Sequence, residues 1–437
     1  MKRTLTLFAA LLCASFLAFS QDIPSPEAAS PSSLGPSAAS PEIIALLQED
    51  LTRAGVNTNA YEFDPIVDTK PPRGYKPFYI SHYSRHGARA NMGDAEYHHV
   101  IKRLSKADSL GILTDEGKEL LAEARAVLEA YDGRSGRLTP RGEREHRLLA
   151  DRMYHRFPQV FKKGPGLVRV ESSTVHRSLV SMASFVSELA ALRPKLRFSI
   201  QSDDILMKIL ANNCSSAQKK EVDRMVKPIL KSKVDTTEIM NRLFTDPVKG
   251  AEIVGNIDRF ERKIWWTACV AENFDLGFNI YKHLPFEVVY KYYDQQNRWI
   301  YLTQCNSAEF GEFRMPRTKP LVDEIIRQAD DAIATGDVAV DLHFGHDWPA
   351  IALASYLGLE GVGDRLSVDE IPLHWFGPKI VSHACNVQII FYRNRKGNIL
   401  VKFLMNEKET LLRGLDPVEG PYYDWSVVRE NLEGWKR

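Results

Sequence analysis

The chain has 437 residues, of which 44% are hydrophobic, so it is long enough to bury one large core or two medium ones. Its 57 basic and 56 acidic residues nearly cancel, so no overall field favours nucleic acid or an anionic membrane as a partner. This balance still allows a basic pocket, because net charge has no bearing on local charge.

The first residues predict export. A basic start is followed by an apolar run at 5–19, and small residues then favour cleavage before Gln21. We therefore expect a signal peptide at 1–20 and a periplasmic or secreted protein. Lipid anchoring through Cys13 is the alternative, while the short apolar run argues against stable insertion in a membrane. The Pro/Ser/Ala-rich stretch 21–41 has too little apolar content to pack and is predicted to be a linker.

Removal of the signal peptide leaves four cysteines: Cys214, Cys269, Cys305 and Cys385. An even number in an exported protein permits two disulfides, with three possible pairings. Cys269 and Cys385 lie in apolar surroundings, which is typical of buried free thiols. The sequence leaves both states open.

Strand patterns come before and after a long helical stretch. Five segments predict strands: the apolar part of FYISHYSRHGAR (78–89), LVRVESS (167–173), LRFSI (196–200), VAVDLHFG (338–345), and a hairpin within 386–405 that turns at Lys396-Gly397-Asn398. Helical periodicity follows Leu138-Thr139-Pro140, where Thr139 suits the N-cap and Pro140 the first helical position.

Residues 201–305 carry long helical patterns and almost no strand signal. Strands alternating with helices on both sides of this stretch predict an α/β fold, in which a sheet core has helices on both faces and is interrupted by a helical cap domain. We assign 42–200 to the first part of the α/β core, 201–310 to the cap insertion and 311–437 to the second part of the core.

Charged and titratable side chains follow three of the predicted strands. Arg85, His86 and Arg89 come after the first strand, and His346 and Asp347 come after the strand at 338–345. Ser172, Ser173 and Thr174 follow LVRVESS and are expected to cap a helix whose first turn carries Arg177. In an open α/β sheet ligands gather outside the carboxyl ends of the strands, so we expect these groups to share one pocket.

Such a pocket would hold three arginines, two imidazoles and a carboxylate. Three guanidinium groups imply an anionic ligand, and a phosphate dianion suits them best. A neutral imidazole can attack as a nucleophile, and a carboxylic acid can protonate the leaving oxygen. These residues predict hydrolysis of a small-molecule phosphate ester through a phosphohistidine, with no metal or other cofactor and no nucleic-acid partner.

The motifs resemble those of the histidine acid phosphatases, which include phytases and multiple inositol polyphosphate phosphatases. RHGAR at 85–89 is similar to the nucleophile motif of that family, and HFGHD at 343–347 is similar to its proton-donor motif. LTPRG at 138–142 and SSTVHRSLVSMASF at 172–185 resemble the two blocks between them. The four blocks stand in the family's order, within about residues 70–405.

The resemblance implies that His86 is the nucleophile and that Asp347 protonates the leaving group. It also implies that four further residues bind phosphate: Arg85, Arg89, Arg177 and His346. A variable helical domain is expected between the third and fourth blocks, in agreement with the helical stretch. Inositol polyphosphates of the phytate type or other organic phosphates are the implied substrates.

The chain departs from the family pattern at three places. Asn91 stands where the family often has proline, and Trp348-Pro349 follow His-Asp where typical phytases have Thr-Asn. Inositol polyphosphate phosphatases tend to carry His-Ala-Glu, from which His346-Asp347 differs. The motifs therefore predict the reaction and leave the substrate open.

Two other classes of protein are alternatives. In a metal-dependent phosphatase, His82 and His86, or His343 with His346 and Asp347, would be ligands, although three arginines disfavour a divalent cation there. A non-catalytic protein that binds a phosphorylated ligand is the other class. The helical stretch also carries lysines that either meet a highly charged substrate or form a solvated face: Lys219, Lys220, Lys227, Lys231 and Lys233.

Overall fold

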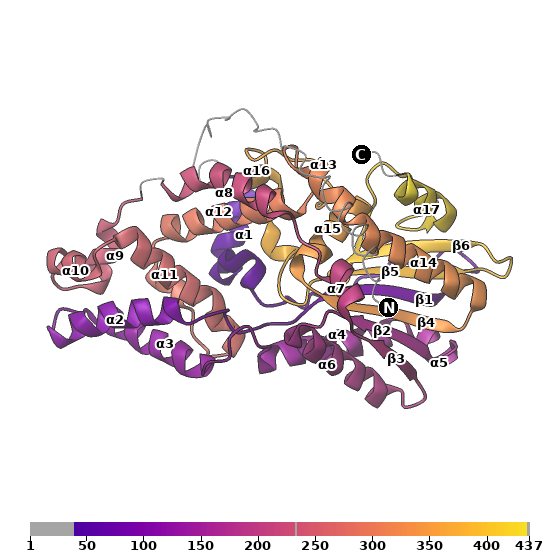
Figure 1. Cartoon of the computed structure of the whole chain (residues 1–437), viewed down its shortest axis with the longest axis horizontal. Helices are drawn as coiled ribbons and strands as arrows, with labels where there is room; N and C mark the ends of the chain where they lie inside the picture. Colours follow the sequence, from indigo (N-terminus) through magenta and orange to yellow (C-terminus); the bar gives the residue numbers. More distant parts are fainter. Residues whose placement is uncertain (1–38, 232–233, 435–437) are drawn as a thin grey trace, which may run out of the picture.

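The computed structural model describes residues 39–231 and 234–434. The predicted signal peptide at 1–20 and most of the predicted linker at 21–41 lie outside these residues. A β-sheet with its covering helices forms one part of the molecule, and a largely helical region extends from one side of it (Figure 1).

The sheet is mixed and has eight strands. These are β1 (Lys76–Arg85), β2 (Leu167–Ser172), β3 (Arg197–Gln201), β4 (Val338–Gly345), β5 (Asn386–Arg393), β6 (Ile399–Met405), β7 (Lys408–Thr410) and β8 (Tyr423–Asp424). Their order is β3-β2-β4-β1-β5-β6-β7, with β8 paired to β6. The first four strands are parallel to their neighbours, whereas β5 runs antiparallel to β1. Each predicted strand is present.

Helices cover both faces of this sheet (Figure 1). One face packs against α4 (Pro140–Arg156), α5 (Pro158–Lys163) and α6 (His176–Leu192), and the other against α14 (Lys319–Thr335), α15 (Asp347–Leu357) and α17 (Trp425–Glu433). Successive side chains of a strand point to opposite faces, so Tyr79 and Ile80 of β1 belong to two different hydrophobic cores. The predicted fold class is confirmed.

The described residues between 202 and 337 contain no strand of the sheet. They form α7 (Asp204–Leu210), α8 (Ser216–Leu230), α9 (Thr237–Leu243), α10 (Pro247–Val254), α11 (Ile257–Ala271), α12 (Phe286–Gln304), α13 (Gly311–Arg314) and the sheet-covering α14. Short helices η3 (Glu272–Phe274), η4 (Ile280–His283) and η5 (Met315–Arg317) connect them. The remaining elements are α1 (Pro41–Glu49), η2 (Leu51–Thr58), α16 (Ile371–His374) and η6 (Gly377–Lys379).

Two helices from the first part of the chain, α2 (Ala95–Ser109) and α3 (Asp115–Tyr131), also pack in the helical region (Figure 1). Lys263 of α11 lies 2.8 Å from Glu96 of α2, and Arg242 of α9 lies 2.6 Å from Glu116 of α3. The helical region is therefore assembled from two separate stretches of chain, although the sequence placed 95–131 within the α/β core.

The sequence predicted the N-caps of two helices, α4 and α6, and the structure agrees with the first prediction but not with the second. Thr139 caps α4 by accepting a hydrogen bond from the Gly142 amide at 3.4 Å, and Pro140 is the first helical residue, as expected. The predicted cap of α6 by Ser172, Ser173 and Thr174 is wrong, since the N-cap residue is Val175 and makes no side-chain cap hydrogen bond. Ser173 instead contacts the imidazole of His346.

The four cysteines of the described residues are buried and form no disulfide with one another. This is the buried-thiol alternative of the two that the sequence left open. In the part of the chain that the structure describes, no helix combines the length and the apolar character needed to cross a membrane.

Candidate active site

The three polar clusters meet at one edge of the sheet because their strands are neighbours. Arg85 at the end of β1 is in register with Gly345 at the end of β4, and Ser172 at the end of β2 is in register with Phe344 of β4. The ring centroids of His86 and His346 are consequently 5.7 Å apart. The structure thus brings together the residues that the sequence assigned to one pocket.

His86 lies on the loop that follows β1, with 2% of its surface exposed. Its Nδ1 is 2.9 Å from the carbonyl oxygen of Gly87, which can only accept, so Nδ1 carries the proton and Nε2 keeps its lone pair. Burial lowers the pKa of His86 well below 6.5, and the charges of Arg85 and Arg177 lower it further. His86 is therefore a neutral imidazole, and its Nε2 makes no hydrogen bond within the part of the chain that the structure describes.

Helix α4 fixes the backbone of this loop. A Cβ on Gly87 would lie 2.5 Å from the carbonyl oxygen of Gly142, so these two segments touch backbone to backbone. Glu145 accepts hydrogen bonds from the amides of Ala88 at 2.7 Å and Tyr61 at 3.2 Å. Burial raises the pKa of Glu145 to about 7. The LTPRG block thus supports the loop from behind.

Three guanidinium groups surround His86, and each has an N–H donor without an acceptor in the described residues. Nη1 of Arg85 donates to the backbone oxygens of Asn57 at 2.6 Å and Val381 at 2.8 Å, and Nη1 of Arg89 donates to the Ala90 oxygen at 2.9 Å. Among the described residues, the buried Nε atoms of Arg85, Arg89 and Arg177 have no hydrogen-bond partner. Buried donors without acceptors are costly, and an anion would satisfy them.

Asp347 is the carboxylate beside these cations. Its Oδ2 lies 3.3 Å from Nη2 of Arg85 and accepts a hydrogen bond from Nδ2 of Asn57 at 2.7 Å. Burial raises the pKa of Asp347, but Arg85, the Asn57 hydrogen bond, His346 and Arg89 together bring it below 3.8. The carboxyl of Asp347 is therefore ionised as long as no bound anion offsets the charges of the arginines. Asn57 belongs to no motif, and the sequence did not indicate it.

His346 is held by two residues of the cluster that follows β2. Nη2 of Arg177 lies 3.4 Å from its Nδ1, which must accept, so its Nε2 carries the hydrogen that faces Oγ of Ser173 at 3.3 Å. Burial and the charge of Arg177 lower the pKa of His346 to about 3. The indole of Trp348 stacks on its ring, with centroids 5.3 Å apart.

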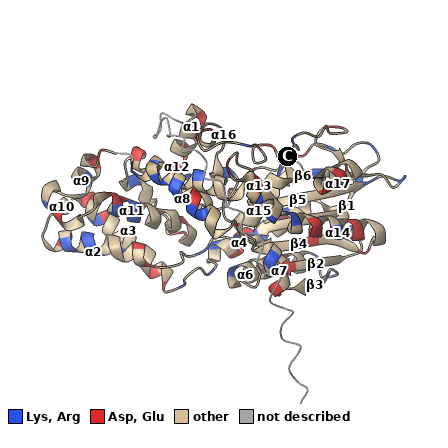
Figure 2. Cartoon of the chain, turned by 45° about the horizontal axis from the view of Figure 1, so that its top comes forward, with Lys and Arg blue, Asp and Glu red and all other residues tan. Residues whose placement is uncertain are grey.

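One lysine of the helical region reaches this site. Nζ of Lys219 on α8 lies 6.0 Å from the ring centroid of Trp348. Lys220, Lys227 and Lys231 are exposed, and Lys233 lies outside the described residues. Figure 2 shows basic residues on α8, whereas acidic and basic residues intermingle over most of the chain. Of these lysines, Lys219 therefore lies next to the site, while Lys220, Lys227 and Lys231 lie on the exposed surface.

The sequence also missed His383, whose ring centroid is 5.8 Å from that of His86. His383 precedes β5 in the segment SHACN and has no motif around it. The antiparallel pairing of β5 with β1 brings this segment beside the nucleophile loop.

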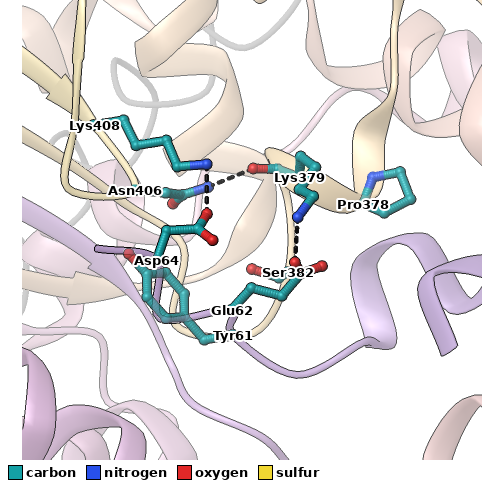
Figure 3. Close-up of a pocket in the computed structure, with 8 residues that line it drawn as sticks. All are labelled: Tyr61, Glu62, Asp64, Pro378, Lys379, Ser382, Asn406 and Lys408. Carbon is teal, nitrogen blue, oxygen red and sulfur yellow. Dashed lines mark hydrogen bonds and ion pairs between the residues drawn. The ribbon is translucent and has the colours of Figure 1, made fainter. Parts of the chain in front are cut away.

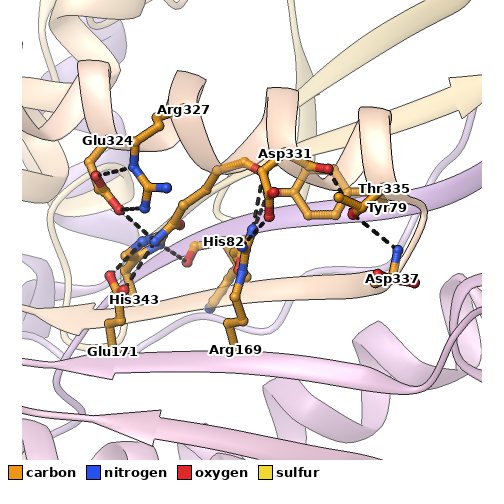
Figure 4. A network of polar contacts seen from close by, with 12 residues as sticks. Tyr79, His82, Arg169, Glu171, Glu324, Arg327, Asp331, Thr335, Asp337 and His343 are labelled. Carbon is orange, nitrogen blue, oxygen red and sulfur yellow. Dashed lines mark hydrogen bonds and ion pairs between the residues drawn. The ribbon is translucent and has the colours of Figure 1, made fainter.

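His82 and His343, which a metal site would use, lie within the sheet. His82 packs against Phe185 and Phe344, at centroid distances of 5.4 and 6.3 Å, and burial lowers its pKa to about 3. His343 lies 3.3 Å from Glu171 in a polar network that includes Arg169 and Asp331 (Figure 4). Across 39–231 and 234–434, no group of three or more His, Cys, Asp or Glu side chains is arranged to hold a metal ion.

Comparison with solved structures shows which proteins share this architecture. The apo form of the Bifidobacterium longum multiple inositol polyphosphate phosphatase is 16% identical, with a TM-score of 0.70 over 87% of this chain and 97% of that one. Its complex with inositol hexasulfate has a TM-score of 0.68 at the same identity and coverage. A phytase from D. castellii is 14% identical, with a TM-score of 0.68 over 93% of this chain and 89% of that one. At these identities the likeness concerns the fold.

No curated protein matches the chain in sequence. The model of the histidine phosphatase superfamily (branch 2), however, matches residues 83–406, which is more than half of the chain and spans every motif described above. The chain belongs to the histidine phosphatase superfamily, branch 2.

Proposed function

We propose that this protein hydrolyses phosphate monoesters through a covalent phosphohistidine at His86. One observation carries the proposal: the free Nε2 of a neutral His86 stands among three arginines whose Nε donors lack partners. That arrangement suits a phosphoryl group, because the arginines attract its oxygens while the imidazole attacks its phosphorus.

In the first step, the lone pair of Nε2 of His86 attacks phosphorus and the bond from phosphorus to the ester oxygen breaks. Protonated Asp347 gives its proton to the departing alkoxide, which leaves as an alcohol. Arg85, Arg89 and Arg177 hold the equatorial oxygens, where negative charge is greatest in the transition state. His346 adds a further contact to the phosphate.

In the second step, a water molecule attacks phosphorus, the bond from phosphorus to Nε2 breaks, and Asp347 takes a proton from that water. The products are inorganic phosphate and a site restored to neutral His86 and protonated Asp347, so one water is consumed for each ester bond. The acid must be protonated at the start. A bound dianion offsets the arginine charges that keep the pKa of Asp347 low, which raises that pKa when substrate is present.

The substrate class that we propose is the inositol polyphosphates and related multiply phosphorylated small molecules. The fold is shared with an inositol polyphosphate phosphatase and a phytase, and Lys219 lies next to the phosphate pocket, beyond Trp348. A ligand with several phosphates could place one at His86 and another near this lysine. Comparison of kcat/KM for inositol hexakisphosphate, a sugar phosphate and an aryl phosphate tests the assignment, which fails if the hexakisphosphate is the poorest of the three.

The decisive experiment for the chemistry is rapid trapping by an alkaline quench with ³²P-labelled substrate. We expect label on the wild-type protein that is stable to alkali and labile to acid, as a phosphoramidate is, and none on His86→Ala. Hydrolysis by His86→Ala at the wild-type rate would exclude the covalent step. Activity that is lost on treatment with a chelator and restored by zinc would favour the metal-dependent alternative.

We also propose that the protein is exported, on the strength of the signal-peptide pattern at 1–20. N-terminal sequencing of the protein from a cell fractionation tests this directly. A mature chain that starts at Gln21 in the exported fraction supports the proposal, and an intact Met1 in the cytoplasmic fraction contradicts it.

A further inference from the structure

A second buried imidazole, that of His383, lies beside the nucleophile and has no part in the mechanism above. Only 1% of the surface of His383 is exposed, and its ring centroid is 5.8 Å from that of His86. A buried polar ring next to a reacting group requires an explanation, because hydrophobic side chains would fill the same space at less cost in desolvation.

The segment that carries His383 is bound to the nucleophile loop along its length. The Ala384 amide donates to the carbonyl oxygen of His86 at 3.0 Å, and the Arg85 amide donates to that of Cys385 at 2.9 Å. The amide of His383 itself donates to Asn59 at 2.9 Å. Ala384 has a φ of +54°, a left-handed conformation that a non-glycine residue rarely adopts and that surrounding contacts must hold. This backbone fixes the position of His383.

The tautomer of the ring follows from its contact with Asn273. Nδ2 of Asn273 donates to the carbonyl oxygen of Arg89 at 3.1 Å, and since a carbonyl only accepts, the amide nitrogen must face this side. The same Nδ2 lies 3.3 Å from Nε2 of His383, so Nε2 accepts and the neutral ring carries its hydrogen on Nδ1. Within the described residues, Nδ1 is buried and without a hydrogen-bond partner.

The surrounding charges keep this ring neutral. Burial holds the pKa of His383 well below 6.5, and Arg85, Arg89, Arg141 and Arg177 lower it further. Three of these are the arginines around His86. His383 therefore lies in the same positive field as the nucleophile and presents an N–H that is uncharged and unused.

The pocket next to this segment does not account for the unused donor. Ser382 lines a small pocket with Tyr61 and Asn406, and His383 does not line it (Figure 3). The charged groups of that pocket are paired with one another, Lys379 with Glu62 and Lys408 with Asp64. A phosphoryl group bound at His86, whose ring centroid lies 5.8 Å from that of His383, would instead bring an acceptor close to this ring.

We propose that His383 is a further phosphate-binding residue. Its Nδ1–H donates a hydrogen bond to an oxygen of the phosphoryl group while that group is transferred from the ester to His86 and then from His86 to water. The inference rests on the proposed function and adds an uncharged donor to the three arginines. A neutral donor binds the phosphoryl oxygens in both steps without repelling the arginines, which a fourth cation would do.

The test compares His383→Leu with His383→Asn, which keeps a side-chain N–H, and with Ser382→Ala as a matched control in the separate pocket. Competitive inhibition by inorganic phosphate is the first readout, and single-turnover rates of labelling and release of His86 are the second. We expect His383→Leu to weaken phosphate inhibition about 10-fold or more and to slow both rates, since a hydrogen bond to a charged group has that magnitude. His383→Asn should recover part of the loss, and Ser382→Ala should behave as wild type.

A folded His383→Leu protein that binds phosphate and turns over as wild type overturns the inference. If this variant does not fold, ¹⁵N-histidine NMR of the wild-type protein decides: added inorganic phosphate should shift the Nδ1–H resonance of His383 downfield, and an unchanged resonance overturns the inference. A trapped phosphohistidine with no effect at His383 would defeat this inference and leave the proposed function intact. Full hydrolysis by His86→Ala would defeat the proposed function itself.

Discussion

Asn57 forms a hydrogen bond with each of two charged residues of the pocket, Asp347 and Arg85. Its Nδ2 lies 2.7 Å from Oδ2 of Asp347, and its backbone oxygen lies 2.6 Å from Nη1 of Arg85. It follows Val56, whose φ of 52° is rare for a β-branched residue. A strained backbone beside a polar contact is typical of functional sites. We infer that η2 holds the carboxyl of Asp347 in place and in its ionised form.

Removal of this hydrogen bond is expected to change the pH dependence of the reaction. The bond from Asn57 lowers the pKa of Asp347, so Asn57→Ala should raise that pKa and leave the acid protonated up to a higher pH. The basic limb of the profile of kcat/KM against pH should then move to higher pH. Gln296→Ala is the control, because Gln296 contacts Oδ1 of Asn57 and makes no bond to Asp347. A basic limb that stays in place would separate Asn57 from the acid.

Replacement of the acid itself should depend on the leaving group. Asp347→Asn removes the proton that a departing alkoxide needs, whereas an activated aryl oxide leaves without one. We expect kcat for an alkyl phosphate to fall about 100-fold or more, and kcat for an activated aryl phosphate to fall much less. Steady-state rates on the two substrates measure this ratio, and equal losses would argue against a proton donor at this position.

The nucleophile should stay active in acid. Because the pKa of His86 is held well below 6.5, kcat/KM should not fall through the range in which an ordinary imidazole becomes protonated. Arg177→Gln removes one of the charges that lower this pKa, so the pKa rises and the acid limb should appear at higher pH. The substrate's own ionisation is the same for both proteins, so the difference between their profiles reports the enzyme. Coincident acid limbs would contradict the assignment.

Lys219 should matter for substrates with more than one phosphate. Its Nζ lies 6.0 Å from the ring centroid of Trp348, which stacks on His346. We expect Lys219→Ala to lower kcat/KM for inositol hexakisphosphate about 3- to 10-fold at low ionic strength and less at high salt, because salt screens such attractions. An aryl monophosphate should be unaffected. The exposed neighbour Lys220 provides the matched control, and equal effects of Lys219→Ala and Lys220→Ala would point to general charge alone.

The sequence predicted those parts of the site that follow directly from local patterns of residues along the chain. Apolar runs and alternation mark the strands, and Arg85, His86, His346 and Asp347 immediately follow two of them. The parallel pairing of β1 with β4 then brings these residues together. Arg177 was predicted from the helix that follows LVRVESS, and the pairing of β2 with β4 brings that strand end to the same edge.

The residues that the sequence missed come from segments with no pattern of their own. Asn57, Asn273 and His383 reach the pocket from three loops or short helices that become neighbours only in the folded chain. The helices α2 and α3 show an ordinary amphipathic pattern, which does not indicate that their partners are α9 and α11. The failed cap prediction has a similar cause, because the hydroxyl of Ser173 faces His346.

Glu145 links the stability of the fold to the nucleophile loop. Its pKa of about 7 lies above the ordinary 4.5, so between these values the unfolded chain releases a proton that the folded protein keeps. Stability should therefore fall as pH rises from 4.5 to 7, by up to about 3 kcal/mol from this group. Glu145→Gln cannot titrate, and it leaves one of the amides of Ala88 and Tyr61 without an acceptor.

We expect Glu145→Gln to be less stable than wild type at pH 4.5 by about 1–3 kcal/mol, the cost of a buried unpaired amide. The deficit should shrink or reverse towards pH 7, because the wild-type protein alone loses stability over this range. Urea unfolding of both proteins at several pH values measures the difference, and Glu143→Gln, which changes a partly exposed residue of the same helix, is the control. A deficit that stays constant from pH 4.5 to 7 would show that Glu145 does not titrate in this range.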